Sequence, residues 1–184
     1  KEEILERINN NTITDILNKI EVKAGDVVMV KAGTIHAIGA GVFICEIQQN
    51  SNCTYRMYDY DRRDKFGNPR ELHVKKALDV VDNHKYIKDN KTEVVIARNE
   101  HFTEERLVQC KYFEVYKYDV NDEAKITVDE ASFVSVLFIN GSGTIETDDY
   151  EKTMEFKAGD SFFVSAGLRS IIIKGQATMV VTRI

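Results

Sequence analysis

The spacing of apolar and polar residues divides the chain into a short helical start and a long β-rich remainder. Between residues 2 and 20, apolar side chains recur three or four positions apart, which predicts two short amphipathic helices on either side of the asparagines at 9–11. From Val22 onward, short apolar runs alternate with glycine turns, a pattern typical of β-strands. Residues 71–81 return to helical spacing, and the polar residues 83–92 are predicted to be a linker.

The β-rich part contains many short strand patterns with turn signals between them, which indicates a β-sandwich or barrel. Residues 133–139 are apolar almost throughout, so we expect both faces of that strand to be buried. The predicted strands are residues 27–30, 42–48, 54–60, 94–97, 107–120, 132–139, 143–148, 161–166, 170–175 and 177–184.

An internal repeat sets the domain organisation. Residues 23–38 read KAGDVVMVKAGTIHAI, and residues 157–172 read KAGDSFFVSAGLRSII, with half of the positions identical. Each copy consists of a turn, an apolar strand and a second turn, and the shared glycines suit turns that need a positive φ or a close backbone approach. Two copies of one supersecondary unit predict two related domains.

Composition excludes several classes of function. A chain of 184 residues has room for one domain or two small ones, and its net charge of −5 argues against a surface that binds nucleic acid or an anionic membrane. There is no apolar run of about 18 residues and no pattern of a signal peptide, so we expect a cytoplasmic protein without a transmembrane helix. The three cysteines show no metal-binding spacing and are expected to be reduced thiols: Cys45, Cys53 and Cys110.

The first copy of the repeat resembles the second cupin motif. Gly25, Lys31, Gly33 and His36 follow that motif's spacing, with Lys31 where proline is usual, and the later copy has Ser170 in place of the histidine. Three longer strings resemble the short bacterial type of class I mannose-6-phosphate isomerases: GTIHAI, CEIQQNSNCTYRMYDYDRRD and GNPRELHVKKALDVV. The resemblance implies an all-β cupin, a jelly-roll β-sandwich, in a bicupin arrangement whose first barrel is incomplete, preceded by a short helical segment.

The resemblance also implies a chemistry and assigns residues to it. The family interconverts mannose 6-phosphate and fructose 6-phosphate through a cis-enediol, with one zinc ion. Its zinc-ligating histidine corresponds to His36, its catalytic arginine to Arg56, and an acidic side chain of its pocket to Glu46. An arginine stays charged and cannot take up a proton, so Arg56 would stabilise the developing enediolate or bind the substrate phosphate.

Each assignment has a simpler alternative by spacing alone. His36 lies between apolar neighbours, where a structural histidine is the more common case. Arg56 could pair with Asp59 or Asp61 across a sheet face, and Glu46 could be a buried carboxylate without a catalytic role. The other histidines are expected to be solvated surface residues, and Arg70 is a weak candidate for phosphate binding: His73, His84 and His101. Residues 61–65 are predicted to be a charged turn that closes with residues 67–69.

One departure from the family concerns the metal. The family holds zinc with further glutamine, histidine and glutamate ligands, but residues 1–20 contain no histidine and no strand pattern. A catalytic zinc normally has three protein ligands, so His36 alone is not a stable site. We therefore expect the chain to be the C-terminal part of a longer enzyme, with the remaining ligands upstream, and to be inactive alone unless another copy or chain completes the pocket.

The expected domains are a helical segment at residues 1–21, the C-terminal half of the metal-binding cupin with its linker at residues 22–92, and a second, non-metal cupin at residues 93–184. Half a barrel leaves edges and an inner face open, so we expect residues 22–60 to be mobile or covered by a homo-oligomeric or domain-swapped contact. The alternative function is a non-catalytic cupin module that binds a sugar or a partner. A bicupin oxygenase or epimerase suits the isomerase-like strings less well.

Overall fold

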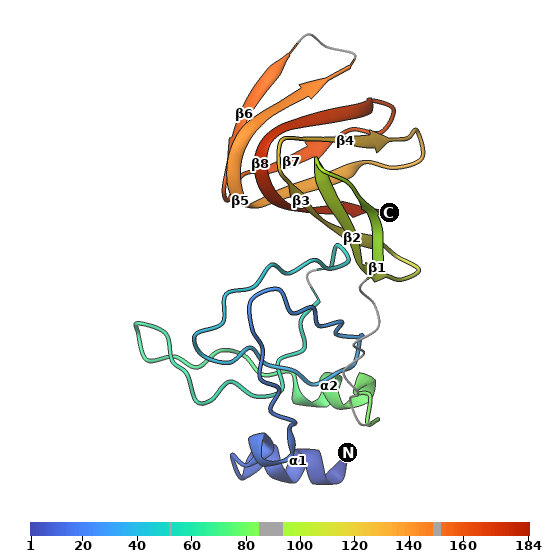
Figure 1. Cartoon of the computed structure of the whole chain (residues 1–184). Coiled ribbons are helices and arrows are strands. Elements are labelled where there is room, and N and C mark those ends of the chain that lie inside the picture. Colours follow the sequence, from blue (N-terminus) through green and yellow to red (C-terminus); the bar gives the residue numbers. More distant parts are fainter. Residues whose placement is uncertain (52, 85–93, 149–151) are drawn as a thin grey trace. The chain divides into compact units, whose positions relative to one another are not determined.

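The computed structural model describes residues 1–51, 53–84, 94–148 and 152–184 and divides the chain into two compact units, residues 1–88 and 89–184 (Figure 1). The first unit contains helix α1 (Glu2–Asn9), the 3-10 helix η1 (Ile13–Ile16) and helix α2 (Val74–Val80). The two predicted N-terminal helices and the helix within residues 71–81 are confirmed. In the described part of the chain, no helix is long and apolar enough to cross a membrane.

The strands predicted between residues 22 and 60 are not formed. Apart from an isolated bridge between Arg63 and Pro69, the described residues between η1 and α2 contain no β-pairing, and this segment runs as turns joined by extended backbone. An apolar run becomes a strand only when a neighbouring strand satisfies its N–H and C=O groups, and the described residues of this unit provide none. Many apolar side chains of this segment are therefore exposed, with Phe43 at 101% as the extreme.

The second unit contains every described strand. The bounds are β1 (Val94–Arg98), β2 (Phe102–Gln109), β3 (Glu114–Val120), β4 (Glu123–Val128), β5 (Val134–Thr147), β6 (Thr153–Lys157), β7 (Ser161–Val164) and β8 (Arg169–Arg183). Predicted residues 107–120 divide into β2 and β3, whereas two pairs of predicted strands merge into the long strands β5 and β8. The predicted linker lies largely outside the described residues.

Two features of the strands correct the sequence analysis. β4 and β6 were not predicted, although the burial along β4 alternates strictly, as its sequence EAKITV would suggest. The expectation that both faces of residues 133–139 are buried was wrong, because β5 alternates between buried and half-buried positions there and Ile139 is exposed. One face of this strand meets the core, and the other lies on the outside of the unit.

All pairings are antiparallel, and the strand order is β1-β2-β3-β8-β5-β6. β8 pairs with β3 through residues 177–183 and with β4 through residues 169–174. β5 likewise pairs with β7 through residues 134–137 and with β6 through residues 142–146. The two halves of each long strand thus belong to two different layers, as expected for a jelly roll.

The core lies between these two layers. Val136 and Phe138 belong to the first half of β5, and Met179 belongs to the second half of β8, which pairs with it. Ile173 belongs to the first half of β8, and Ile126 belongs to β4, which pairs with that half. All five side chains are fully buried in one cluster. Phe138 stacks on Phe156 with ring centroids 3.7 Å apart. Burying one such side chain contributes about 1.5–3 kcal/mol, so this cluster is the main source of stability in the unit.

The turn from one layer to the other depends on close backbone approach. Gly141 in β5 has φ +90°, and a side chain there would overlap the carbonyl oxygen of Gln176 in β8 and reach 2.8 Å from the Cα of Ala177. In the neighbouring strand, Asn121 and Asp122 interrupt the path from β3 to β4, and Gly175 donates to the carbonyl of Asp122 at 2.7 Å. Three adjacent strands therefore bend at the same level, visible as the curvature of β5 and β8 in Figure 1.

The two copies of the internal repeat keep the same local turns. Asp26 donates its N–H to the carbonyl of Lys23, and Asp160 to that of Lys157, both at 3.1 Å. The carboxylate of each aspartate also accepts the N–H of the lysine three residues earlier, at 3.3 Å and 2.9 Å. The turns are thus fixed by local sequence in both copies, whereas the strand that follows forms only in the second, where β5 is present to pair with β7.

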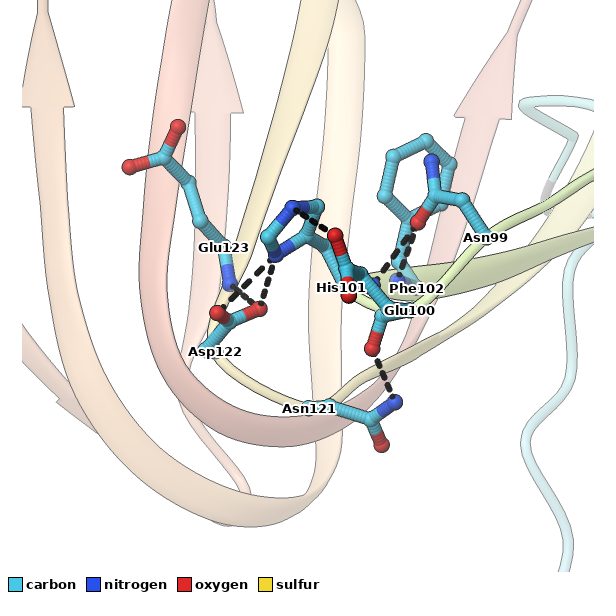
Figure 2. A network of polar contacts seen from close by, with 7 residues as sticks. All are labelled: Asn99, Glu100, His101, Phe102, Asn121, Asp122 and Glu123. Atoms are coloured by element: carbon cyan, nitrogen blue, oxygen red, sulfur yellow. Dashed lines mark hydrogen bonds and ion pairs between the residues drawn. The ribbon is translucent and has the colours of Figure 1, made fainter.

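A polar network fastens the β1–β2 turn to the interruption between β3 and β4. The ring of His101 hydrogen bonds through Nδ1 to both carboxylate oxygens of Asp122 at 2.9 Å, and its Nε2 lies 3.5 Å from Glu100 (Figure 2). Asn121 donates its N–H to the carbonyl of His101 at 2.7 Å, and Asn99 accepts the N–H of His101. The hydrogen bond and charge of Asp122 raise the pKa of His101, and His101 lowers the pKa of Asp122.

This network predicts a pH-dependent stability. A raised folded-state pKa means that His101 contributes fully below the unfolded histidine pKa of 6.5, and the contribution is lost as the pH rises through the folded value. Asp122 contributes above the unfolded aspartate pKa of 3.8 and loses its contribution as the pH falls. His101→Gln should therefore lower the urea midpoint of residues 1–184 at pH 5.5 and have a smaller effect at pH 8.5.

Asp122→Asn serves as the control because it removes the partner of His101. Its effect on the urea midpoint should likewise be larger at pH 5.5 than at pH 8.5. A His101→Gln effect of equal size at both pH values would contradict an electrostatic contribution from this pair.

Candidate functional site

His36 follows the second turn of the first repeat copy. Thr34 donates to the carbonyl of Lys31 at 3.1 Å to close the turn, and Nδ1 of His36 lies 2.9 Å from the carbonyl oxygen of Thr34. A carbonyl can only accept, so Nδ1 carries the proton and Nε2 of the neutral ring is left as the acceptor. His36 is exposed. Its ring is thus held in the tautomer that a metal-ligating histidine needs, with a backbone carbonyl as the supporting partner.

Arg56 is half-buried and is fixed by residues at the start of α2. Its backbone carbonyl accepts the N–H of His73 at 2.7 Å, and its own N–H donates to Nδ1 of His73 at 3.3 Å. Its guanidinium donates through Nη1 to the carbonyl oxygen of Glu71 at 3.1 Å. These contacts leave the remaining guanidinium N–H groups for a ligand, since no carboxylate in the described residues pairs with Arg56.

Helix α2 places the two candidate residues relative to each other. His73 precedes its first turn and holds Arg56, while Asp82, just after its last turn, donates its N–H to the carbonyl of Gly33 at 2.9 Å. Gly33 belongs to the turn that carries His36, and a side chain at Gly33 would approach the carbonyl of Val80 to 2.7 Å. The seven residues of α2 span about 10 Å, so this helix fixes the spacing between the His36 turn and Arg56.

Glu46 is exposed, and no hydrogen bond or ion pair joins it to His36 or Arg56 within the described residues. Of the three predicted site residues, the structure therefore connects His36 and Arg56 indirectly, through α2, and leaves Glu46 apart from that framework.

Asp59 carries the main buried charge of the first unit. Its side chain is 7% exposed, and its carboxylate accepts Nε of Arg70 at 2.7 Å and Nη2 of Arg62 at 2.5 Å. Hydrogen bonds from Arg70 and then Arg62 lower the pKa of Asp59 to about 2. Asp59 is thus already paired and is not the partner of Arg56, and Arg70, the weak phosphate candidate, is engaged here.

A turn with two residues at positive φ places Arg62 beside the carboxylate of Asp59. Tyr60 and Asp61 have φ values of 55° and 51°, and Arg62 donates its N–H to the carbonyl of Asp59 at 2.9 Å. Positive φ is unfavourable for such residues by roughly 1–2 kcal/mol each, and the ion pairs of Asp59 hold the turn in place. The predicted charged turn is confirmed, and Asp64 closes its tip by accepting the N–H groups of Phe66 and Asn68.

In the second repeat copy, the position of His36 is taken by Ser170. This serine is 2% exposed, and its hydroxyl donates to the carboxylate of Asp148. Lys125 lies 3.4 Å from the same carboxylate. In the second copy, a hydrogen-bonded serine thus occupies the position at which the first copy has an imidazole.

The described residues do not form a complete metal site. No group of three or more His, Cys, Asp or Glu side chains that could hold a metal ion occurs among them. His36 fits as one ligand, by tautomer and by its contact with Thr34, but one imidazole does not make a catalytic metal centre.

Sequence reasoning missed two residues of this framework. His73 was expected to be solvated, yet its side chain is only 24% exposed and contacts Arg56. Asp59 was considered only as a partner for Arg56. The predicted helix at residues 71–81 included His73, and the sequence carried no signal that α2 begins only at Val74 and leaves the His73 ring beside Arg56.

Comparison with known proteins shows which enzymes this chain resembles. The family model "Mannose-6-phosphate isomerase, cupin domain" matches residues 103–184. The whole chain is 41% identical to the putative mannose-6-phosphate isomerase YvyI and 33% identical to the mannose-6-phosphate isomerase ManA, both of Bacillus subtilis, and covers 57% of each. The crystal structure of the mannose 6-phosphate isomerase from Bacillus subtilis matches the whole chain with a TM-score of 0.88 and 39% identity. Over its whole length the chain is thus similar to part of the mannose-6-phosphate isomerases, and its residues 103–184 match the cupin domain of that family.

The match also defines what the chain contains. It spans just over half the length of the isomerases that it matches, and it covers 57% of the Bacillus subtilis crystal structure. A Streptococcus mutans mannose-6-phosphate isomerase is 38% identical over 145 residues. The all-β cupin fold with a short N-terminal helix, expected from the sequence, is confirmed.

Proposed function

We propose that residues 1–184 are the C-terminal portion of a zinc-dependent isomerase that interconverts mannose 6-phosphate and fructose 6-phosphate. The observation that carries this proposal is the match of the whole chain, at a TM-score of 0.88, to a mannose 6-phosphate isomerase. The match includes the first unit, in which His36 and Arg56 are tied to opposite ends of α2.

His36 is the proposed zinc ligand of this chain. Its Nε2 is the free ring nitrogen, and imidazole nitrogen is a preferred ligand of zinc. When bound, zinc acts as a Lewis acid that makes the hydrogen next to a sugar carbonyl more acidic. The further ligands are proposed to come from the part of the isomerases that this chain does not cover.

Arg56 is the proposed catalytic residue. Its permanent charge and planar donor set suit either the oxygen of a developing enediolate or the phosphate of the substrate, and its tie to Glu71 directs the side chain before substrate arrives. Glu46, which is exposed, is proposed as the pocket carboxylate of this chain.

A coupled isomerase assay tests this function. We expect residues 1–184 with added zinc to show no turnover of mannose 6-phosphate, because the described residues provide one candidate ligand. In an isomerase chimera, residues 1–184 replace the matching C-terminal part of Bacillus subtilis ManA, and this chimera should bind one zinc ion and turn over mannose 6-phosphate. A folded, zinc-loaded chimera without activity would overturn the proposal and favour a non-catalytic cupin module.

A further inference from the structure

His73 and Arg56 share one backbone hydrogen bond, which is half of the contact that an antiparallel pair would make. In an antiparallel pair, two opposite residues exchange two N–H···O=C hydrogen bonds. His73 gives one of these, from its N–H to the carbonyl of Arg56 at 2.7 Å. Its own carbonyl does not return the second and instead accepts the N–H of Ala77 at 2.9 Å in the first turn of α2.

The ring of His73 supplies the missing acceptor. The N–H of Arg56 donates to Nδ1 of His73 at 3.3 Å, so the side chain replaces the carbonyl that the helix has taken. Since a backbone N–H can only donate, Nδ1 must be unprotonated and the proton of the neutral ring lies on Nε2. That nitrogen is 3.7 Å from the carboxylate of Glu71, which stabilises the same tautomer.

The same short segment also holds the Arg56 side chain. Nη1 of Arg56 donates to the carbonyl of Glu71, two residues before His73, at 3.1 Å. The His73 ring lies against Tyr55, with ring centroids 6.3 Å apart, and its side chain is 24% exposed. The backbone and the guanidinium of Arg56 are thus both fixed by residues 71–73, and the hydrogen bond to Nδ1 is the one that depends on the identity of a side chain.

We infer that His73 is a positioning residue that holds Arg56 in its working orientation through Nδ1. This inference rests on the proposed role of Arg56. A catalytic donor is effective only when it is held within a fraction of an ångström of its productive position, so loss of this hydrogen bond should weaken whatever Arg56 does.

Two variants separate the hydrogen bond from the bulk of the ring. His73→Phe keeps the aromatic contact with Tyr55 but has no acceptor, whereas His73→Asn places an oxygen close to the position of Nδ1. In the isomerase chimera, His73→Phe should lower kcat/KM about tenfold, the order expected for one lost hydrogen bond, and His73→Asn should stay within about threefold of the unaltered protein.

A double-substitution cycle tests whether His73 acts through Arg56. The loss in His73→Phe should be divided between kcat and KM in the same way as the loss in Arg56→Ala. His73→Phe should have no further effect on kcat/KM when Arg56→Ala is already present. An equal loss in both backgrounds would overturn the inference, because a residue with a merely structural role would lower activity regardless of Arg56.

A spectroscopic readout on residues 1–184 does not require activity. Nitrogen-15 spectra of the His73 ring should show the tautomer protonated at Nε2, and the Arg56 amide should exchange slowly in the unaltered chain and in His73→Asn but rapidly in His73→Phe. A ring protonated at Nδ1, or an unchanged exchange rate in His73→Phe, would overturn the positioning role. An inactive chimera with these spectra intact would instead contradict the proposed isomerase function and leave the His73–Arg56 contact established.

Discussion

Replacement of Arg56 by alanine should lower turnover in the isomerase chimera by about 10²–10³-fold while its zinc content stays unchanged. The guanidinium is held by Glu71 and His73 and meets no carboxylate in the part of the chain that the structure describes, so its charge is available to the substrate. Loss of one preorganised donor typically lowers kcat by about 10²–10³-fold. The measurement is the coupled assay together with metal analysis of the same protein sample.

Two further variants sharpen this prediction. Arg56→Lys keeps a positive charge but loses the planar donor set, and we expect it to recover only part of the activity. Arg98→Ala is a matched control, because Arg98 is exposed on β1 and lies 4.0 Å from Glu105, and it should leave turnover unchanged. If zinc were lost from Arg56→Ala, Arg56 would be a structural residue and the proposed role would be wrong.

The second large effect concerns stability. Gly141→Ala should destabilise residues 1–184 by about 3–5 kcal/mol, because the methyl group would overlap the Gln176 carbonyl and the residue would be strained at positive φ. The clash is with backbone, and the two long strands β5 and β8 are paired on both sides of it, so neither can move away without loss of ladder hydrogen bonds. Urea unfolding followed by far-ultraviolet circular dichroism measures the change.

Gly159→Ala provides a matched control within the same unit. Gly159 has φ +91°, nearly the φ of +90° at Gly141, but nothing lies within 4 Å of its added methyl group. Its expected cost is the conformational strain alone, about 1–2 kcal/mol. Equal losses for the two variants would show that close approach at the bend is not what requires glycine at position 141.

The hydrophobic pattern was most informative where the chain supplies its own pairing partners. Strands such as β1 and β7 were predicted from short apolar runs and were found close to the predicted bounds. Residues 42–48 have an equally strong pattern but form no strand, since no described neighbour offers them a ladder. β4 was missed because it is short and polar on one face, although its alternation was visible in the sequence.

The candidate site could be predicted only in part. The resemblance pointed to His36, Glu46 and Arg56, and these assignments stay predictions. Local patterning could not reveal that α2 links the His36 turn to Arg56, or that His73 accepts a hydrogen bond from Arg56, because these contacts join residues 17 or more positions apart. Pairing of Asp59 with Arg70, eleven positions away, was equally hidden and replaced the simpler expectation of a pair with Arg56.

The sequence by itself determined the resemblance to the isomerases, the turns of the internal repeat and the helical and strand character of most segments, because these depend on residue type and on neighbours within a few positions. The tertiary structure alone decided which apolar runs became strands, where β5 and β8 bend, and which side chains hold Asp59 and Arg56. The physical reason is that a strand, a buried charge and an oriented arginine each need a partner from a distant part of the chain, and local patterning carries no record of that partner.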